Sequence, residues 1–270
     1  MRTLTVFVDG IGVWAPGIED WSALQRVLGA GDIAVPDVHV NAATAKPAPA
    51  ILPPTERRRA PEPVLLASEA ASQAATMAGR DPSTLACVFT STHGDLAITD
   101  EMCATLAADP RELSPTRFHN SVHNAPAGYW TVAAHCNKTA TAISAGLSSF
   151  AAGILEAATE VAADGDAVLL AAYDIVARGP LAEVAPSGVP FAAAFVLSPS
   201  RSAGTIAQLT IYPLQGTAAP KDLPAALAAL AANPTAVQAL PLLIALRDRK
   251  PAKVTLTSGA NTSLAIEVAP

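Results

Sequence analysis

Aromatic and charged side chains are scarce in this chain of 270 residues. Phe, Trp and Tyr make up 4% of it and Asp, Glu, Lys and Arg 15%, whereas hydrophobic residues reach 51%. An average globular protein has about 25% charged residues. This composition excludes intrinsic disorder, which requires many charges and few apolar residues. The chain must therefore bury most of its length or offer an apolar face to a partner.

The chain also lacks a surplus of basic residues and a long apolar run. Its formal net charge is −6, whereas binding along a nucleic-acid backbone requires a basic face. No run approaches the ~18 apolar residues of a membrane span, and the N-terminus lacks the layout of a signal peptide. Cys87, Cys103 and Cys136 form neither a disulfide ladder nor a CxxC zinc pattern. We therefore expect a protein of the reducing cytoplasm, with no membrane span and no structural metal.

Strand-like and helix-like segments alternate along the chain. The patterns predict strands at residues 3–8, 85–92, 139–142, 167–175, 190–197, 205–212, 253–257 and 264–268, and helices at 21–28, 64–77, 98–107, 126–135, 147–163, 223–231 and 235–246. A tight turn is expected at Asp9–Gly12, and irregular structure at 30–63 and 114–124.

The strands and one helix together indicate the fold class. Most strands are apolar on both faces, which is typical of a sheet covered on both sides. The helix at 147–163 is apolar nearly all round, as a helix buried between two layers is. We therefore predict an α/β fold with two sheets, a five-layer α-β-α-β-α sandwich.

Four long segments and the last strand pair carry a family resemblance. They are Val8–Leu24, with a Gly-Ile-Gly sequence followed by Trp, then Val64–Asp95, Ser114–Ala157, Ser187–Pro199 and Thr257–Val268. In this order they resemble the β-ketoacyl synthases of the thiolase fold. The closest likeness is to the short, divergent ketosynthase-like proteins of bacterial aryl-polyene and xanthomonadin-type pigment clusters. The resemblance implies one thiolase-like domain over 1–270, with an N-terminal half at 1–199 and a reduced C-terminal half at 200–270.

The chain departs from the family at its catalytic residues. Active members read Thr-Ala-Cys-x-x-Gly, whereas residues 141–146 read Thr-Ala-Ile-Ser-Ala-Gly, so Ile143 stands in place of the thiol. A thiolate is needed to hold the acyl chain as a thioester, and isoleucine has no such chemistry. The two C-terminal histidines of active members are also missing, because the last of the five histidines is His135. The joint loss predicts a subunit that does not condense acyl chains.

The family contains subunits of this kind. Chain-length factors resemble ketosynthases, lack the nucleophile and pair with an active synthase in a pseudo-twofold dimer, where they help to shape the acyl tunnel. The resemblance implies that this chain pairs in this way with a full-length β-ketoacyl synthase and an acyl carrier protein, without a cofactor. Two alternatives remain open. One is a self-sufficient acyltransferase or condensing enzyme that uses Ser144 or Cys136, and the other is a homodimeric structural protein without an acyl role.

Three aromatic residues and Ile143 are candidates for the tunnel or the dimer interface. Phe118, Tyr129 and Trp130 stand out because aromatic residues are scarce here and are enriched at interface centres. Packing in the core is the alternative for all three. Ile143 is expected either to gate or plug the tunnel or to pack in the core.

Polar candidates lie in the same segment and in an earlier basic run. His119, His123 and Asn124 are expected in a polar network of the pocket or interface, with plain loop hydrogen bonding as the alternative. The i, i+4 spacing of the two histidines also suits a metal, but no carboxylate or third ligand accompanies them. The run Arg57–Arg59 is a candidate docking patch for an acidic carrier protein, although a solvated loop is the simpler interpretation.

Overall fold

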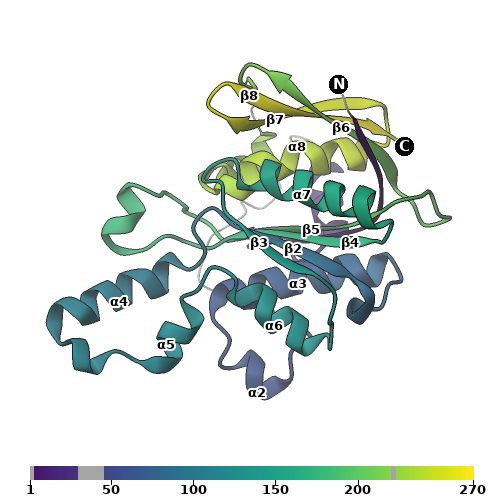
Figure 1. The fold of residues 1–270 in the computed structure, drawn as a ribbon. Coiled ribbons are helices and arrows are strands. Elements are labelled where there is room, and N and C mark those ends of the chain that lie inside the picture. The colour runs from purple at the N-terminus through teal and green to yellow at the C-terminus, as the bar shows by residue number, and fades with distance from the viewer. Residues whose placement is uncertain (1–2, 30–45, 220–222) are drawn as a thin grey trace.

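The computed structural model describes residues 3–29, 46–219 and 223–270 (Figure 1). The strands are β1 (Leu4–Trp14), β2 (Ala86–Thr90), β3 (Ala140–Ile143), β4 (Val168–Asp174), β5 (Phe191–Ser198), β6 (Ala207–Gln215), β7 (Ala252–Gly259) and β8 (Thr262–Ala269). The α-helices are α1 (Trp21–Gly29), α2 (Pro54–Arg57), α3 (Glu62–Met77), α4 (Leu96–Ala108), α5 (Pro115–Asn120), α6 (Ala125–Ala133), α7 (Ser149–Asp164) and α8 (Pro234–Asp248). Short 3₁₀ helices are η1 (Pro82–Thr84), η2 (Pro110–Glu112), η3 (Gly179–Glu183) and η4 (Ala225–Ala232).

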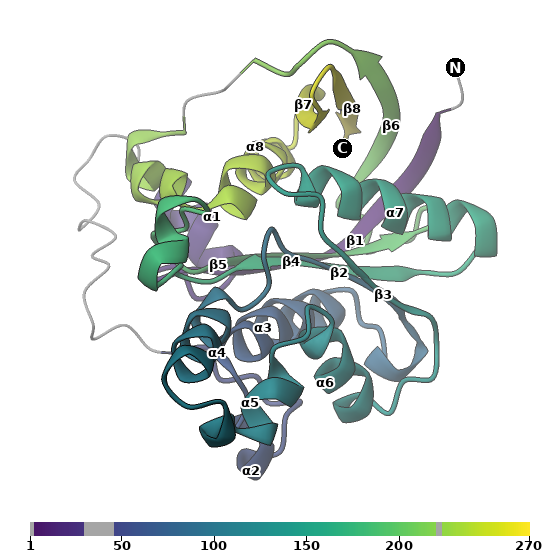
Figure 2. The ribbon, with the colours of Figure 1, turned by 60° about the vertical axis from the view of Figure 1, so that its left-hand side comes forward.

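All eight of these strands are hydrogen-bonded in the order β3-β2-β4-β5-β1-β6-β8-β7. The strand β2 pairs in parallel with β3 and β4, and the remaining pairs are antiparallel. The long strand β1 pairs with β5 through residues 7–14 and with β6 through residues 4–8. It thereby passes from one β layer into a second one, as the curved strand in Figure 2 shows.

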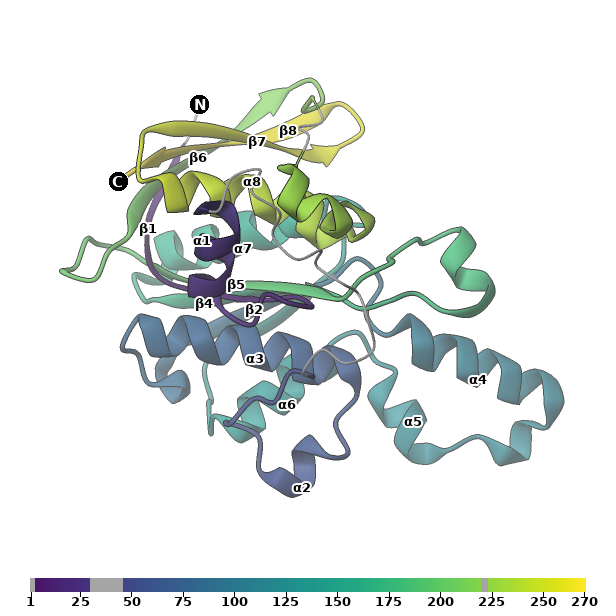
Figure 3. The same ribbon diagram turned by 180° about the vertical axis from the view of Figure 1, so that it is seen from behind.

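The helices lie on both sides of the first β layer and fill the space between the two layers. Helices α3 and α6 pack on one face of β3-β2-β4-β5-β1, whereas α7 and α8 pack between its other face and β7 (Figures 1 and 2). Helix α1 lies on the same side as α8, as Figure 3 shows from behind. The predicted α/β class with a shortened C-terminal half is confirmed.

The described residues do not form the outermost helix layer of the expected five-layer sandwich. Among the described residues, no helix covers the outer face of β6, β8 and β7 (Figure 1). Residues of β6 alternate between buried and partly or fully exposed, which is typical of a strand packed on one face only. The short C-terminal half thus forms the second β layer without an outer helix layer.

Two apolar cores, one on each face of the first β layer, hold the layers together. The larger core joins α7, α8 and α1 to both β layers, and the smaller core lies between the first layer and helices α3 and α6. Alanine supplies many of the buried residues of α3, including Ala67, Ala70, Ala71 and Ala74. Small side chains allow the helix to lie close to the sheet, so the few aromatic residues are sufficient to fill the remaining space.

Residues Asp9–Gly12 do not form the expected turn, because β1 continues through them with a β-bulge between Val8 and Gly10. The glycines serve close packing instead. A Cβ at Gly12 would lie 1.9 Å from the Ala70 carbonyl oxygen, and one at Gly10 would lie 2.1 Å from that of Ala74. Only glycine allows the backbone of α3 to approach β1 so closely.

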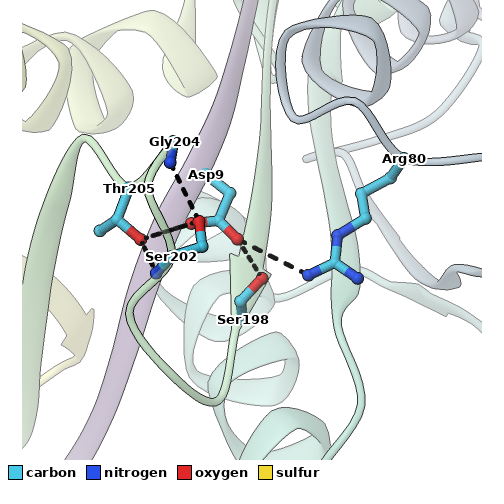
Figure 4. A network of polar contacts seen from close by, with 6 residues as sticks. All are labelled: Asp9, Arg80, Ser198, Ser202, Gly204 and Thr205. Atoms are coloured by element: carbon cyan, nitrogen blue, oxygen red, sulfur yellow. Dashed lines mark hydrogen bonds and ion pairs between the residues drawn. The ribbon is translucent and has the colours of Figure 1, made fainter.

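Asp9 lies at the bulge, and its buried carboxylate connects β1 to the loop between β5 and β6 (Figure 4). Its Oδ2 accepts a hydrogen bond from Ser198 Oγ at 2.6 Å, and its Oδ1 accepts one from Thr205 Oγ1 at 2.8 Å. Arg80 places a guanidinium nitrogen 3.8 Å from Oδ2. A buried charge is tolerated when it is paired and hydrogen-bonded in this way, so Asp9 fixes the point where β1 passes between the layers.

Other expectations on secondary structure need smaller corrections. The segment 114–124 is not wholly irregular, because Ser114 accepts a hydrogen bond from the Arg117 backbone N–H and begins α5. The segment 223–231 forms the 3₁₀ helix η4 rather than an α-helix. His39 and the first part of the expected irregular stretch, residues 30–45, lie outside the described residues, whereas the rest of that stretch contains α2 and the start of α3. No helix among the described residues is long and apolar enough to cross a membrane.

Candidate functional site

The carboxyl ends of β2, β3 and β4 meet at one edge of the first β layer. Strand β3 ends at Ile143, residues 144–148 turn, and α7 begins at Ser149. Gly146 has a φ of +56° within this turn, a conformation that glycine adopts without strain. The half-buried Ile143 side chain packs against the larger core. A strand, a sharp turn and a buried helix thus form an elbow whose first residue is aliphatic.

The hydroxyl group of Ser144 is engaged by the neighbouring loop. Its Oγ donates a hydrogen bond to the Thr92 carbonyl oxygen at 2.7 Å. A catalytic serine must instead donate to a general base within hydrogen-bond reach. Ser144 therefore acts here as a link between the elbow and the loop that follows β2.

A hydrogen-bond network beneath the elbow is centred on the buried carboxylate of Asp174, at the end of β4. Its Oδ1 accepts from Ser91 Oγ and from the Thr92 backbone N–H, and its Oδ2 accepts from Thr92 Oγ1 and from Thr235 Oγ1, all at 2.7–2.9 Å. The Asn233 side chain adds a bond to the Asp174 carbonyl oxygen at 3.0 Å. The network joins β2, β4 and the N-terminus of α8, and its polar atoms are satisfied within the protein.

Asp95 begins α4 beside this network. Its carboxylate accepts a hydrogen bond from the Ile98 backbone N–H at 2.9 Å and thereby caps the helix. Burial raises the pKa of Asp95, while the Ile98 and Ala97 backbone N–H groups and the charges of Arg117 and Arg178 oppose the shift. Its neighbour His93 is exposed.

The two buried cysteines are not accessible nucleophiles. Cys136 is 7% exposed and donates a hydrogen bond from Sγ to the Leu85 carbonyl oxygen at 3.2 Å. Burial, together with the neighbouring Cys136, raises the pKa of the Cys87 thiol to about 12. Nucleophilic cysteines have the opposite properties, a lowered pKa and an accessible sulfur.

An open groove of about 590 Å³ lies between α6, α5 and the segment around α2. We call it the α6 groove. One face of α6 forms its floor through residues at i, i+3, i+4, i+7 and i+8: Ala125, Gly128, Tyr129, Val132 and Ala133. Leu52, Pro53 and Glu56 line it from the α2 segment. Nine helical residues correspond to a floor of about 13 Å, and its lining is mainly apolar.

Polar side chains lie toward the two ends of this floor. His119 and Asn124 line the groove near the N-terminus of α6, and His135 lines it just beyond the C-terminus. Tyr129 lies between them, and its hydroxyl group donates to Asn120 Oδ1 at 3.1 Å. The arrangement suits an elongated apolar molecule with polar contacts near its ends.

The structure separates the residues that the sequence analysis grouped together. His119, Asn124 and Tyr129 line the α6 groove, whereas His123 turns to the Ser91 carbonyl oxygen at 3.2 Å. The two histidines therefore do not share a ligand site. Trp130 is fully buried against Phe89, with ring centroids 6.4 Å apart, and it packs in the core rather than in the groove.

Several large apolar side chains are exposed around the groove and the elbow. Val132 is 75%, Leu147 70% and Phe118 60% exposed. Strand β3 lies between α6, which carries Val132, and α7, which carries Leu155. Among the described residues β3 is the edge strand of the sheet, so one side of its backbone is unpaired. Leu147 also borders a second apolar groove of about 500 Å³ beside η4, α8 and β7. Exposed apolar side chains beside an open strand edge are features of a protein interface.

The basic run of α2 divides into one anchored and two exposed residues. Arg57 Nη1 donates to the Ala48 carbonyl oxygen at 3.2 Å and to that of Pro49 at 3.5 Å. Arg58 and Arg59 are exposed. They directly follow α2, whose Glu56 lines the groove, so two of the three expected docking charges are exposed to solvent.

Some groove residues have no individual signal in the sequence. Val122, Val132 and His135 line the groove beside the residues that the sequence analysis named, and Leu52 reaches it from a segment much earlier in the chain. The periodic small and apolar residues of α6 are the one pattern that indicates a groove floor. Among the described residues, no three His, Cys, Asp or Glu side chains gather as metal ligands.

Comparison with known proteins places the chain in a family. The model of the β-ketoacyl synthase N-terminal domain matches residues 34–259. The chain therefore belongs to the β-ketoacyl synthase family. No curated protein sequence matches it significantly.

Solved structures of ketosynthases share its fold. One contains the ketosynthase ApeO in complex with its chain length factor ApeC from Xenorhabdus doucetiae, with a TM-score of 0.72, 22% identity, and coverage of 98% of this chain and 99% of the other. A type II polyketide synthase acyl carrier protein in complex with its ketosynthase (AntDE:AntF) gives a TM-score of 0.75 at 14% identity, with 99% of both chains covered. A β-ketoacyl synthase from Burkholderia phymatum STM815 gives 0.62 at 15% identity, with 81% of this chain and 66% of the other covered.

Proposed function

We propose that this chain is a non-condensing, chain-length-factor-type subunit that pairs with a full-length ketosynthase and forms part of the wall of its acyl tunnel. The observation that carries the proposal is the elbow after β3. The elbow consists of a strand, a turn and a helix, Ile143 stands where the resemblance puts the family's thiol, and the Ser144 hydroxyl group donates to the Thr92 carbonyl oxygen. The fold is kept while the group that would hold a thioester is absent.

The exposed apolar side chains support an interface with a ketosynthase. Phe118, Val132 and Leu147 are each at least 60% exposed, and among the described residues β3, which packs against the helix that carries Val132, is an edge strand. Leaving such side chains in water is unfavourable by about 25 cal/mol per Å² of apolar surface. The ApeO structure contains a ketosynthase together with its chain length factor, and another solved structure is described as a ketosynthase–chain length factor, which supports a partner of the same fold.

The α6 groove supports an acyl ligand. Its lining is mainly apolar, and its floor is a helix face of small and apolar residues. An alkyl or polyene chain contributes binding energy through burial of its apolar surface. We propose that the groove forms one wall of a tunnel that the partner closes, and that Phe118, which is exposed beside it, contacts the partner. The product class would be a polyene or another chain of the fatty-acid type.

Arg58 and Arg59 support a contact with an acidic carrier protein. Both are exposed and directly follow α2, whose Glu56 lines the groove. Complementary charges at the rim of an interface speed association and select the partner. The AntDE:AntF structure contains an acyl carrier protein in complex with a ketosynthase, so a carrier protein is a reasonable third component.

The proposal is tested by mixing the purified chain with a full-length ketosynthase from the same organism. We expect native mass spectrometry to detect a one-to-one complex. A stable homodimer that ignores the synthase would favour a structural protein without an acyl role. Intact mass after incubation with an acyl-carrier thioester or with cerulenin tests the self-sufficient enzyme, because a covalent adduct on Ser144 or Cys136 would contradict a non-condensing subunit.

A further inference from the structure

Strand β3 is an edge of the sheet within the described residues, and it has one helix on each of its faces. Helix α6 packs on one face and α7 on the other (Figure 2). Two side chains of β3 face α7, because Thr141 Oγ1 donates to Glu160 Oε1 at 3.1 Å and Ile143 packs against the core that contains α7. A molecule that adds to the free edge of β3 therefore also meets α7.

A row of acidic side chains lies on the part of α7 that is nearest this edge. Glu156, Glu160 and Asp164 follow one another at i, i+4 and i+8, a spacing that places side chains along one side of a helix. Glu156 and Glu160 are half-buried and Asp164 is exposed. We call these three residues the α7 acidic row. Leu155, next to Glu156, is 39% exposed, so apolar and acidic groups are presented together.

No basic side chain in the described part of the chain neutralises the α7 acidic row. The ion pairs found there include none of its three residues. Lys138, which precedes β3, pairs instead with Asp166 at 3.2 Å. The surroundings of the β3 edge on this face of the sheet thus have an excess of negative charge.

Glu160 also has a buried oxygen atom without a hydrogen-bond donor. Its Oε1 accepts the bond from Thr141, whereas its Oε2 is buried and has no partner among the described residues. Burial raises the pKa of Glu160, the Thr141 hydroxyl group opposes the shift, and the charges of Glu156 and Asp164 add to it. A buried acceptor without a donor is unfavourable, so a donor from another molecule would stabilise this carboxylate.

We propose that the α7 acidic row selects the molecule that pairs along β3, because it opposes a second copy of this chain and favours a ketosynthase with basic side chains on its facing surface. This inference rests on the proposed pairing with a ketosynthase. Two copies that join their β3 edges antiparallel about a twofold axis place both α7 helices on the same face of the joined sheet. The two acidic rows would then lie side by side, and like charges oppose association. A lysine or arginine of the ketosynthase would instead supply the donor that Glu160 lacks.

The test compares self-association of the full-length wild-type chain with that of the double variant Glu156→Gln and Glu160→Gln. Both changes remove a charge and keep the size of the side chain. We expect sedimentation equilibrium at low salt to show that the variant dimerises at least about ten-fold more tightly than the wild type. The difference should shrink in about 1 M salt, where the Debye length falls to about 3 Å. Equal self-association of the two proteins would overturn the role of the row.

A matched control removes the same amount of charge elsewhere. The double variant Glu19→Gln and Glu267→Gln changes two exposed carboxylates, one ahead of α1 and one on β8, which is next to the opposite edge of the sheet. This variant should dimerise no more tightly than the wild type. The control thereby separates the position of the acidic row from the net charge of −6.

A second measurement tests the choice of partner. A full-length ketosynthase from the same organism should bind the Glu156→Gln, Glu160→Gln variant a few-fold more weakly than the wild type and with less dependence on salt. Unchanged affinity would overturn the basic facing surface. If the synthase bound none of the proteins, the proposed function would fail, whereas the self-association data would still decide whether the row opposes a second copy.

Discussion

The elbow region and the α6 groove differ in how their polar groups are used. Around the elbow, Asp174 accepts bonds from Ser91, Thr92 and Thr235, and the Ser144 hydroxyl group donates to a carbonyl oxygen. Around the groove, no hydrogen bond or ion pair within the described residues involves the side chains of His119 and His135. The first region satisfies its polar groups internally, and the second leaves them for another molecule.

The difference indicates which of the two regions is suited to bind another molecule. A catalytic site of this kind requires an accessible nucleophile beside a base. In the elbow of this chain, the Ser144 hydroxyl group instead donates a hydrogen bond to the Thr92 carbonyl oxygen. A binding surface requires apolar area with a few free polar groups, and the groove and its surroundings have both. This contrast is the basis of the proposed role as a non-condensing subunit that binds other molecules.

The largest expected effect comes from breaking the network beneath the elbow. Asp174→Ala leaves the buried donors of Ser91, Thr92 and Thr235 without their acceptor, and it should lower the free energy of unfolding by about 3–4 kcal/mol. Urea denaturation measures the change. Asp166→Ala, which removes only the exposed pair with Lys138, should stay within about 0.5 kcal/mol. Equal effects would show that the network is not structural.

A charge on the exposed apolar surface should act on the partner and not on the fold. Phe118→Asp places a carboxylate at a side chain that is 60% exposed, so stability should hardly change. Affinity for the ketosynthase should fall at least about 30-fold, as at an interface hot spot. Phe118→Leu keeps the site apolar and should retain most of the affinity. Surface plasmon resonance measures both variants, and unchanged binding by Phe118→Asp would exclude this surface from the interface.

Charge reversal beside the groove should have a smaller effect. The double change Arg58→Glu and Arg59→Glu should weaken carrier-protein binding a few-fold at low salt and less at high salt, because exposed charges are screened. Arg111→Glu reverses another exposed charge on η2 and serves as the control. Titration of the chain–synthase complex with labelled carrier protein at two salt concentrations gives the comparison. A loss that does not depend on salt would contradict an electrostatic docking patch.

Restoring the thiol should not restore the reaction. Ile143→Cys returns the family nucleophile to the elbow, but residues 174–270 contain no histidine to serve as base. We expect the new thiol to react with iodoacetamide while carbon–carbon bond formation from acyl and malonyl carrier proteins stays at background. Condensation by this variant would show that the elbow has kept more catalytic machinery than the structure suggests.

The sequence predicted the order of the elements well, because apolar strands and Ala-rich helices have distinct periodicities. It predicted the stretch Asp9–Gly12 wrongly, because a glycine that allows a turn and a glycine that allows close packing look the same in one sequence. Gly10 packs against Ala74 and Gly12 against Ala70 of α3, which lie 64 and 58 positions further along the chain, by subtraction of the residue numbers. The positive φ of His135 is likewise a property of the backbone, and no residue pattern indicates it.

The candidate site was predicted only where it lies within one segment. His119, Asn124 and Tyr129 lie close together along the chain and line the groove as a group. Leu52 reaches the same groove from a much earlier segment, and its place follows from the packing of the α2 segment beside α6. Trp130 shows the opposite difficulty, because it is next to Tyr129 in sequence and yet points into the core. Adjacent helical residues point in different directions.

The most direct test of the central claim is the rate of chain elongation by a full-length ketosynthase from the same organism. Acyl and malonyl carrier proteins are supplied, and the products are measured by mass spectrometry with the synthase alone, this chain alone, and both together. The account predicts elongation by the pair and background from this chain alone. Full elongation by the synthase alone, or condensation by this chain alone, would contradict it.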